Sequence, residues 1–440
     1  MPSSLRGKRP PVSPLALLGG EPVLSDRLRP YRSMGAAEVA AVARVVESDC
    51  LSGFYGSWSE RFWGGPLVRA FEQAWCERFG VRHAVSVNSG TSGLCAAMGA
   101  IGLSPGDEVI VPPYTMSATA MAPLVYGVIP VFADIDPDTF CLSPGAVRQA
   151  LTPRTKAILA VNLFGHPAPL AELKDIADQH AIQLVEDNAQ GPLAMEHNRY
   201  AGTVGHIGVF SLNYHKHVHT GEGGMCVTND DDLALRLQMI RNHGENIVEH
   251  KDIVDLTNLV GFNFRMTELS AAVGLEQLKC IDGHVSKRED VGRSLSASVA
   301  GLEGLTAPRV RAGCRHVYYV WAMRLDEAVL GVSRIQFSKA LAAEGFPHEI
   351  GYVRPLYRLP LFQKRVAIGA RGYPFNLTTI RYDEVACPVT ERMEESELLT
   401  FEPCAYDLDE TVVRRLGEAI QKVHAHRHEL VALEKTASRG

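Results

Sequence analysis

The stretch 156-KAILAVNLFGHPAPLAELKDIADQHAIQLVED-187 carries the pattern that decides the fold. An apolar run of strand length, KAILAVNLF, is followed by the amphipathic segment LAELKDIADQHA and then by a second apolar run, IQLVED. Apolar strands that alternate with helices are typical of parallel sheets, because helices cover both faces and bury the strands. This stretch therefore predicts one strand–helix–strand unit of an α/β protein.

The same alternation extends on both sides of this stretch, with helices expected at 67–79 and 92–101. The seven apolar runs of strand length are AVSV (84–87), EVIV (108–111), IPVFADI (129–135), KAILAVNLF (156–164), IQLVED (182–187), IGVFSL (207–212) and GMCVT (224–228). They predict a mostly parallel seven-stranded sheet between helices. Ligands of such sheets bind beyond the carboxyl ends of the strands, so we expect the site there.

The remaining sequence predicts an arm and a second domain. Residues 1–35, rich in Pro, Arg and Ser, indicate an N-terminal arm. We expect a large domain over 36–285, beginning with a helix at 36–48, and a small α+β domain over 286–440. Helices of the small domain are expected at 285–300, 333–344 and 409–434, and its strands at 316–324 and 347–353.

The composition excludes several classes of protein. The 440 residues are 46% hydrophobic and 21% charged, as in soluble globular proteins. The formal net charge is -6 without a basic block, so nucleic-acid binding is not expected. No run approaches the roughly 18–20 apolar residues of a membrane span, and PLALL near the N-terminus is too short for a signal peptide. The nine cysteines lie singly, which favours a reducing cytoplasm and argues against zinc or iron–sulfur sites.

Polar segments follow two of the predicted strands. The segment 88-NSGTSG-93 opens a helix, whose N-terminus could bind a phosphate or could simply be capped. In 186-EDNAQ-190, Asp187 needs a partner, because an unpaired buried charge is costly. That partner could be a protonated ring nitrogen, a metal ion or an arginine. The G-x-G-x-x-G and GxxxxGK[ST] motifs of dinucleotide and P-loop sites are missing.

The stretch 210-FSLNYHKHVHTGEGGMCVTND-230 admits two interpretations. If 213–219 were extended, His215, His217 and His219 would share one face and could bind a metal, with Lys216 on the other face. If Lys216 were instead a covalent anchor, the histidines would be incidental. No carboxylate lies at ligand spacing within the run, so the metal interpretation is the weaker one.

Seven blocks occur in the order and spacing of one known family. They are 88-NSGTSGL-94, 106-GDEVIVPPYT-115, 130-PVFADIDPDTF-140, 161-VNLFGHPA-168, 185-VEDNAQ-190, 210-FSLNYHKHVHTGEGGMCVTND-230 and 261-GFNFRMTELSAA-272. With these blocks the chain resembles the DegT/DnrJ/EryC1/StrS sugar aminotransferases, which have pyridoxal-phosphate fold type I, over roughly residues 15–430.

The resemblance implies a role for each matching residue. Lys216, in the register F-S-x4-Lys-x4-G-E-G-G, resembles the lysine that holds pyridoxal 5'-phosphate through a Schiff base. Asp187 matches the aspartate that keeps the ring nitrogen protonated. Further cofactor contacts are implied for Gly90, Thr91, Ser92 and Ser211 near the phosphate, Gln190 near the phenolic oxygen, Met116 on the ring face, and Asn263 toward the phosphate of a neighbouring subunit.

The chain departs from the family at three places, one of which is Asn188, where small residues are frequent. Met116 stands where an aromatic residue often stacks on the ring, and the 51–66 loop is longer and more aromatic than usual. That loop could shape a ligand or partner surface, or simply pack. Candidate substrate contacts are Asn162, His219, Tyr352 and Arg354. For His215 and His217 we expect rings that point away from the Lys216 side chain.

The resemblance implies a homodimer with shared active sites. It also implies a ping-pong aminotransferase that moves an amino group from glutamate or glutamine to a keto-sugar, possibly nucleotide-linked, or to a ketocyclitol, in secondary-metabolite or cell-surface sugar biosynthesis. The alternatives are a related dehydratase and a non-catalytic regulator. Some dehydratases related to the family carry histidine in place of the lysine, and others keep the lysine and bind an iron–sulfur cluster through cysteines. Lys216 argues against the first kind, and the scattered cysteines argue against the second. Intact Lys216, Asp187 and Gln190 argue against the regulator.

Overall fold

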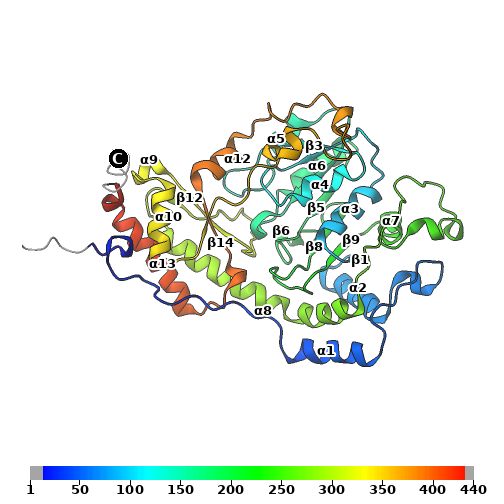
Figure 1. Ribbon diagram of the computed structural model, residues 1–440, viewed down its shortest axis with the longest axis horizontal. Helices are drawn as coiled ribbons and strands as arrows, with labels where there is room; N and C mark the ends of the chain where they lie inside the picture. The colour runs from blue at the N-terminus through cyan, green and yellow to red at the C-terminus, as the bar shows by residue number, and fades with distance from the viewer. Residues whose placement is uncertain (1–12, 432–440) are drawn as a thin grey trace, which may run out of the picture.

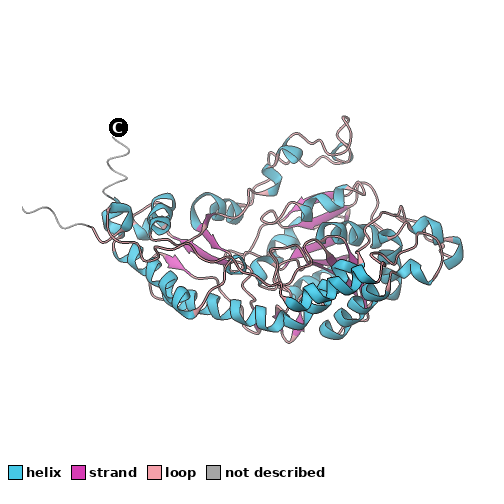
Figure 2. Cartoon of the chain, turned by 60° about the horizontal axis from the view of Figure 1, so that its bottom comes forward, coloured by secondary structure: helices cyan, strands magenta, loops and turns pink. Residues whose placement is uncertain are grey.

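The computed structural model describes residues 13–431 and contains two groups of strands along its length (Figures 1 and 2). Residues 1–12 of the predicted arm and 432–434 of the predicted last helix lie outside the described residues. The larger sheet has seven strands in the order β1-β9-β8-β5-β4-β2-β3. These strands are β1 His83–Val87, β2 Glu108–Val111, β3 Ile129–Phe132, β4 Thr155–Val161, β5 Gln183–Asp187, β8 Ile207–Ser211 and β9 Gly224–Thr228.

All seven predicted strands are confirmed, and only β9 runs antiparallel to its neighbours. The continuous apolar runs are explained by two core clusters. In β2, for example, Val109 and Val111 belong to one cluster and Ile110 to the other. The helices of this region are α2 Pro66–Phe79, α3 Gly90–Ala100, α4 Ala118–Leu124, α5 Pro144–Ala150, α6 Leu170–Gln179 and α7 Asp231–Arg241.

Helix α8, Glu268–Val299, connects the two halves of the molecule (Figure 1). Its first half packs against α2 and α1 (Ala36–Glu47), and its second half packs against α13 (Glu410–Ala425). The predicted helix at 285–300 is the second half of α8, so residue 285 lies inside a continuous helix. None of the helices within residues 13–431 is long and apolar enough to cross a membrane.

The smaller sheet is antiparallel, with the order β10-β12-β14-β13. Its strands are β10 Leu305–Thr306, β12 Trp321–Leu325, β13 Glu349–Ile350 and β14 Leu398–Phe401. The helices beside it are α9 Glu327–Leu330, α10 Arg334–Ala343, α12 Pro388–Arg392 and α13, whereas α11 Pro360–Gln363 packs on the large domain, where the ring centroid of Phe362 lies 5.1 Å from that of Phe132 in β3. The sequence pattern did not indicate β14. The short strands β6 Met195–Glu196, β7 Arg199–Tyr200 and β11 Cys314–Arg315 form a third sheet.

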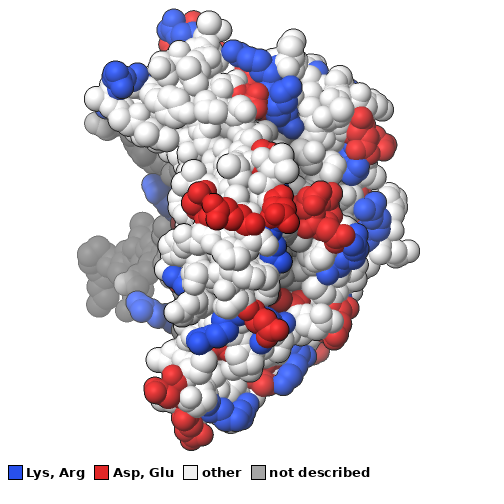
Figure 3. All heavy atoms as spheres, turned by 90° about the vertical axis from the view of Figure 1, so that its right-hand side faces the viewer, with Lys and Arg blue, Asp and Glu red and all other residues white. Residues whose placement is uncertain are grey.

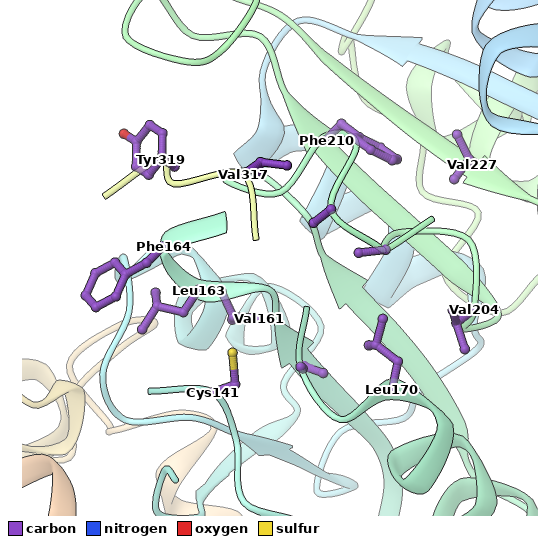
Figure 4. Close-up of a cluster of buried hydrophobic side chains, with 14 of the residues drawn as sticks. Cys141, Val161, Leu163, Phe164, Leu170, Val204, Phe210, Val227, Val317 and Tyr319 are labelled. Atoms are coloured by element: carbon purple, nitrogen blue, oxygen red, sulfur yellow. The ribbon is translucent and has the colours of Figure 1, made fainter. Parts of the chain in front are cut away.

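The predicted strand at 316–324 is wrong over residues 316–320, which form no strand. The backbone of this segment bonds to the large domain instead. The N–H of Val317 donates to the carbonyl of Gly165 at 2.9 Å, and that of Val320 to the carbonyl of Phe164 at 3.2 Å. Figure 4 shows Val317 and Tyr319 beside Phe164 in the buried cluster. The segment therefore joins the two domains.

The predicted arm packs along the small domain before it reaches α1. Leu15 and Leu24 are buried in the core of that domain. The N–H of Leu24 donates to the carbonyl of Glu344, and that of Tyr31 to the carbonyl of Ala405. The arm is thus held by apolar burial and by backbone hydrogen bonds.

Candidate active site

A pocket of about 310 Å³ opens at the carboxyl ends of β1, β4, β5 and β8, between the sheet and residues of the small domain. Its lining residues are Ser89, Gly90, Thr91, Leu94, Thr115, Met116, Ala118, Val161, Asp187, Ala189, Gln190, Ser211, Asn213, His215, Lys216, Glu222, Tyr319, Tyr352 and Glu402. The strand ends meet here because parallel strands terminate at one edge of a sheet. The pocket therefore brings together eight of the thirteen residues expected from the sequence.

One end of the pocket is the start of α3. Ser89 caps the helix by accepting the N–H of Ser92 at 3.0 Å, while the helix start leaves the N–H groups of Gly90 and Thr91 without intrahelical acceptors. A Cβ on Gly90 would lie 3.0 Å from the Cβ of Ser211, so a larger residue would have to push Ser211 back by a few tenths of an ångström. Free N–H groups, the helix dipole and a nearby hydroxyl suit a phosphate. Ser92 bonds to Asn88 instead and lies outside the lining.

Asp187 is the last residue of β5 and is buried. Its oxygens accept the Thr119 hydroxyl at 3.0 Å and the N–H of Ala189 at 3.1 Å. Burial raises the pKa of this carboxyl, while the two hydrogen bonds and the charge of Lys216 oppose the rise. A buried carboxylate of this kind gains stability from a cationic N–H partner.

Lys216 lies in the turn that follows β8. Its Nζ donates to the Tyr319 hydroxyl at 3.1 Å and lies 4.4 Å from the centroid of that ring. Burial lowers the pKa of the amine, and Asp187 partly opposes this shift. A lysine with a lowered pKa is neutral more of the time, and a neutral amine is the nucleophile that attacks an aldehyde.

Gln190 and Tyr352 form one wall of the pocket. The Nε2 of Gln190 donates to the Tyr352 hydroxyl at 2.8 Å, and its Oε1 accepts the N–H of Phe164 at 2.7 Å. Burial raises the pKa of Tyr352 to about 12, so its hydroxyl stays protonated at neutral pH. Met116 also lines the pocket, is 59% exposed and can lie against a flat ligand.

The three histidines around Lys216 diverge, because the segment is a turn and not a strand. His217 is buried and its Nδ1 lies 3.1 Å from Nη1 of Arg288, whereas His219 bonds to Ser33. His215 lines the pocket beside Lys216, so the expectation that it points away is wrong. Among the described residues no group of three or more His, Cys, Asp or Glu could hold a metal ion.

Asn162 does not reach the pocket. It is fully buried, and its amide donates to Glu186 at 3.1 Å and to Asn188 at 2.9 Å. Its Oδ1 accepts the N–H of Ala168 at 2.8 Å. The side chain is occupied in fixing the loop after β4, so the structure gives it no route to a substrate.

Three further predicted residues lie outside the pocket lining of their own chain. His219 faces the N-terminal arm through Ser33. Asn263 is exposed and accepts a hydrogen bond from Arg265 at 2.8 Å. Arg354 is also exposed, although it follows Tyr352 by two residues.

The sequence pattern missed five residues that shape the site: Thr119, His215, Glu222, Tyr319 and Glu402. Tyr319 lies in a segment that was predicted to be a strand, so its hydroxyl gave no signal. Glu402 follows β14, which was not predicted. Glu222 was used only to set the register of Lys216, although a glutamate in a glycine-rich turn could have indicated a site.

The residues present fit pyridoxal phosphate. Lys216 offers an amine for the aldehyde, Asp187 a carboxylate for a protonated ring nitrogen, and the start of α3 a site for the phosphate. Fold and site together define a pyridoxal-phosphate enzyme of fold type I.

The model of the DegT/DnrJ/EryC1/StrS aminotransferase family matches residues 57–400, and the chain belongs to this family. Its members are pyridoxal-phosphate-dependent, and the expected aminotransferase class is confirmed.

Named relatives are similar over 64% to 96% of this chain. The L-glutamine:2-deoxy-scyllo-inosose aminotransferase of Streptomyces kanamyceticus is 35% identical over 439 residues, covering 96% of this chain and 99% of the relative. The GDP-perosamine synthase of Caulobacter vibrioides is 38% identical over 282 residues, covering 64% of this chain and 75% of the relative. The structure of DesI, solved in the presence of its TDP-sugar product, is 30% identical with a TM-score of 0.77, covering 96% of this chain and 100% of DesI.

Proposed function

We propose that this protein transfers the amino group of glutamine or glutamate to the ketone of a keto-sugar or ketocyclitol. The observation that carries the proposal is the meeting of Lys216, Asp187 and the start of α3 in one pocket. The relatives support the substrate class, since their names include an inosose, a GDP-sugar and a TDP-sugar. Donor and acceptor would occupy the pocket in turn.

Five residues would hold the cofactor. Lys216 would bind its aldehyde, Asp187 would keep its ring nitrogen protonated, and Gly90, Thr91 and Ser211 would hold its phosphate. When bound, pyridoxal phosphate supplies an electron sink that acidifies the carbon carrying the amine.

Proton transfer falls to Lys216. Once its amine is free, Nζ can take a proton from the substrate carbon, because its lowered pKa keeps the amine partly neutral. The same Nζ would then deliver that proton to a carbon of the cofactor. Tyr319 orients this amine through the 3.1 Å hydrogen bond. Burial raises the pKa of the Tyr319 hydroxyl, so it stays protonated and acts by position.

Half-reactions test the proposed function. L-Glutamine or L-glutamate should remove the visible absorbance of the bound cofactor, and a ketocyclitol or nucleotide-linked keto-sugar should restore it. Lys216→Ala should abolish both changes, whereas Lys279→Ala, at an exposed lysine, should not. Cycling that persists in Lys216→Ala would refute the role of this lysine, and no response to either amino acid would refute the proposed reaction.

We also propose a homodimer in which Asn263 serves the neighbouring pocket. Asn263 is exposed and lies outside its own pocket lining. The segment before it exposes Val254, Leu256 and Val260, with Val254 96% exposed. This segment follows α7 at the end of the molecule that Figure 3 shows, where wide uncharged areas separate the charged groups. An exposed apolar segment beside a predicted shared residue supports a partner surface.

Complementation tests the shared site. Asn263→Ala and Lys216→Ala should each impair turnover alone. Co-expressed subunits should recover activity, because one pocket of the mixed dimer then contains both native side chains. If Asn263 serves its own pocket, mixing restores nothing.

A cytoplasmic location is supported by the cysteines, all nine of which are free. Alkylation during cell lysis followed by mass spectrometry should find them reduced. Disulfides present before lysis would contradict this location.

A further inference from the structure

Glu402 is a pocket residue to which no role has been assigned above. It follows β14, at the start of the short 3-10 helix Pro403–Ala405, and lines the same pocket as Lys216. The residue keeps exposed surface that a ligand can reach, although neighbouring residues shield part of it from water. Its carboxylate is coupled electrostatically to the Lys216 amine, whose charge lowers the pKa that burial raises.

The oxygens of Glu402 are free to accept hydrogen bonds. Asp187 already accepts bonds from Thr119 and Ala189, and Glu222 accepts the Nδ2 of Asn213 at 2.8 Å. Within residues 13–431, by contrast, the Glu402 carboxylate has no hydrogen-bond or ion-pair partner at bonding distance. Of the carboxylates that line the pocket, this one has its acceptor capacity left for a substrate.

The charge around Glu402 restricts which group can lie beside it. Lys216 is the only lysine or arginine among the described residues that line the pocket, and it is the residue that would be bound to the cofactor. Glu349 on the neighbouring strand adds further negative charge. A second carboxylate placed against Glu402 would be repelled, whereas an N–H or O–H group would be bound.

Glutamine and glutamate differ only in the group at the end of the side chain. Their α-amino and α-carboxylate groups are identical, so these groups contribute equally to the binding of both amino acids. The side chain ends in a carboxamide in glutamine and in a carboxylate of nearly the same shape in glutamate. Steric fit therefore separates them poorly, and the sign of the neighbouring charge separates them well.

We propose that Glu402 is a specificity-determining residue that accepts a hydrogen bond from the side-chain carboxamide of the amino donor and so selects L-glutamine over L-glutamate. This inference rests on the proposed aminotransferase function. It concerns the donor half-reaction, in which no acceptor takes part.

Single-turnover kinetics of the holoenzyme test the inference. The loss of visible absorbance on mixing with each amino acid gives a second-order rate constant. The ratio of the rate constants for glutamine and glutamate is the readout. We expect a ratio of about 10 to 100 in the native protein, in keeping with a like-charge contact. Glu402→Gln should reduce it to below about threefold, by slowing glutamine and accelerating glutamate.

Glu349→Gln is the matched control. It removes one negative charge from β13, which pairs with β14, but at a residue outside the pocket lining. The glutamine-to-glutamate ratio should therefore stay within about twofold of the native value. A general field effect would instead make the two variants alike, which would overturn the inference.

Other outcomes separate this inference from the proposed function. If both amino acids react and Glu402→Gln leaves the ratio unchanged, the inference fails and the aminotransferase function stands. An unchanged ratio with weaker binding of the ketone would assign Glu402 to an acceptor hydroxyl, and would also overturn it. If neither amino acid reacts, the proposed function and the inference fail together.

Discussion

At the scale of single residues, Asp187 combines two opposing demands. Its carboxylate must be buried to meet a ring nitrogen, and burial raises its pKa. The Thr119 hydroxyl and the N–H of Ala189 compensate only in part. In the cofactor-free protein this residue therefore weakens the fold at neutral pH, and the cofactor contact proposed for it accounts for its burial.

The pH dependence of stability follows from this shift. Between its ordinary pKa and the raised value, the folded protein binds more protons at Asp187 than the unfolded chain. The contribution of Asp187 is therefore present at low pH and is lost as pH rises through the raised pKa. In a cofactor-free Lys216→Met background, which removes the coupled amine, Asp187→Asn should gain stability relative to its parent as pH rises from about 4 to 8. Thermal unfolding would measure it, and parallel pH profiles would contradict it.

Residues in the site differ in how far sequence could predict them. Lys216 was identifiable because its flanking residues match the register of the family that the chain resembles, and Asp187 because a charged residue ends an apolar strand. Tyr319 and Glu402 reach the pocket only through the packing of the small domain on the large one. Asn162 lies in a block that matches the family, yet its side chain bonds to Glu186 and Ala168, which are outside the pocket lining.

At the scale of elements, α3 must lie close to the sheet for its N-terminus to reach the pocket. Gly93 permits this approach. A Cβ at that position would lie 2.7 Å from Val209 Cγ1 and 3.1 Å from Cys226 Sγ, which are buried side chains of β8 and β9. The glycine sets the separation between helix and sheet.

Replacing this glycine should displace the helix. Gly93→Ala should cost about 1–3 kcal/mol of unfolding free energy, as overpacking does, and should weaken cofactor binding because the helix start moves. Gly283→Ala is the control, since its Cβ would meet nothing within 4 Å on α8, and it should gain up to about 1 kcal/mol. Urea unfolding and cofactor titration would measure both, and similar effects of the two variants would show that helix propensity dominates.

At the scale of the whole molecule, Glu344 ties the two ends of the described chain together. It is fully buried and accepts the N–H of Ala16 at 2.9 Å and of Val23 at 3.0 Å. Its other partner is Lys422 of α13, whose Nζ lies 2.8 Å away. One carboxylate thus joins the arm, α10 and the last long helix.

Loss of that carboxylate should release the arm. Glu344→Ala leaves two N–H groups unpaired and Lys422 with only its hydrogen bond to the carbonyl of Glu21, which should cost about 1–3 kcal/mol. Limited proteolysis should then cut within residues 13–34 sooner than in the native protein. Glu418→Gln, at an exposed ion pair of α13, should leave stability and cleavage near native. An arm equally protected in Glu344→Ala would show that apolar burial of Leu15 and Leu24 alone holds it.

The sequence by itself determined the large sheet, because each strand is a continuous apolar run buried on both faces and each helix carries its own period. It also indicated Lys216 through its resemblance to the family pattern, because the spacing of Phe210, Ser211 and 221–224 around the lysine can be compared without tertiary information. Only the tertiary structure decided the small-domain wall of the pocket, the path of the arm and the turn that separates the three histidines. These features depend on contacts between segments far apart in the chain, such as Lys216 with Tyr319, and local periodicity contains no information about such contacts.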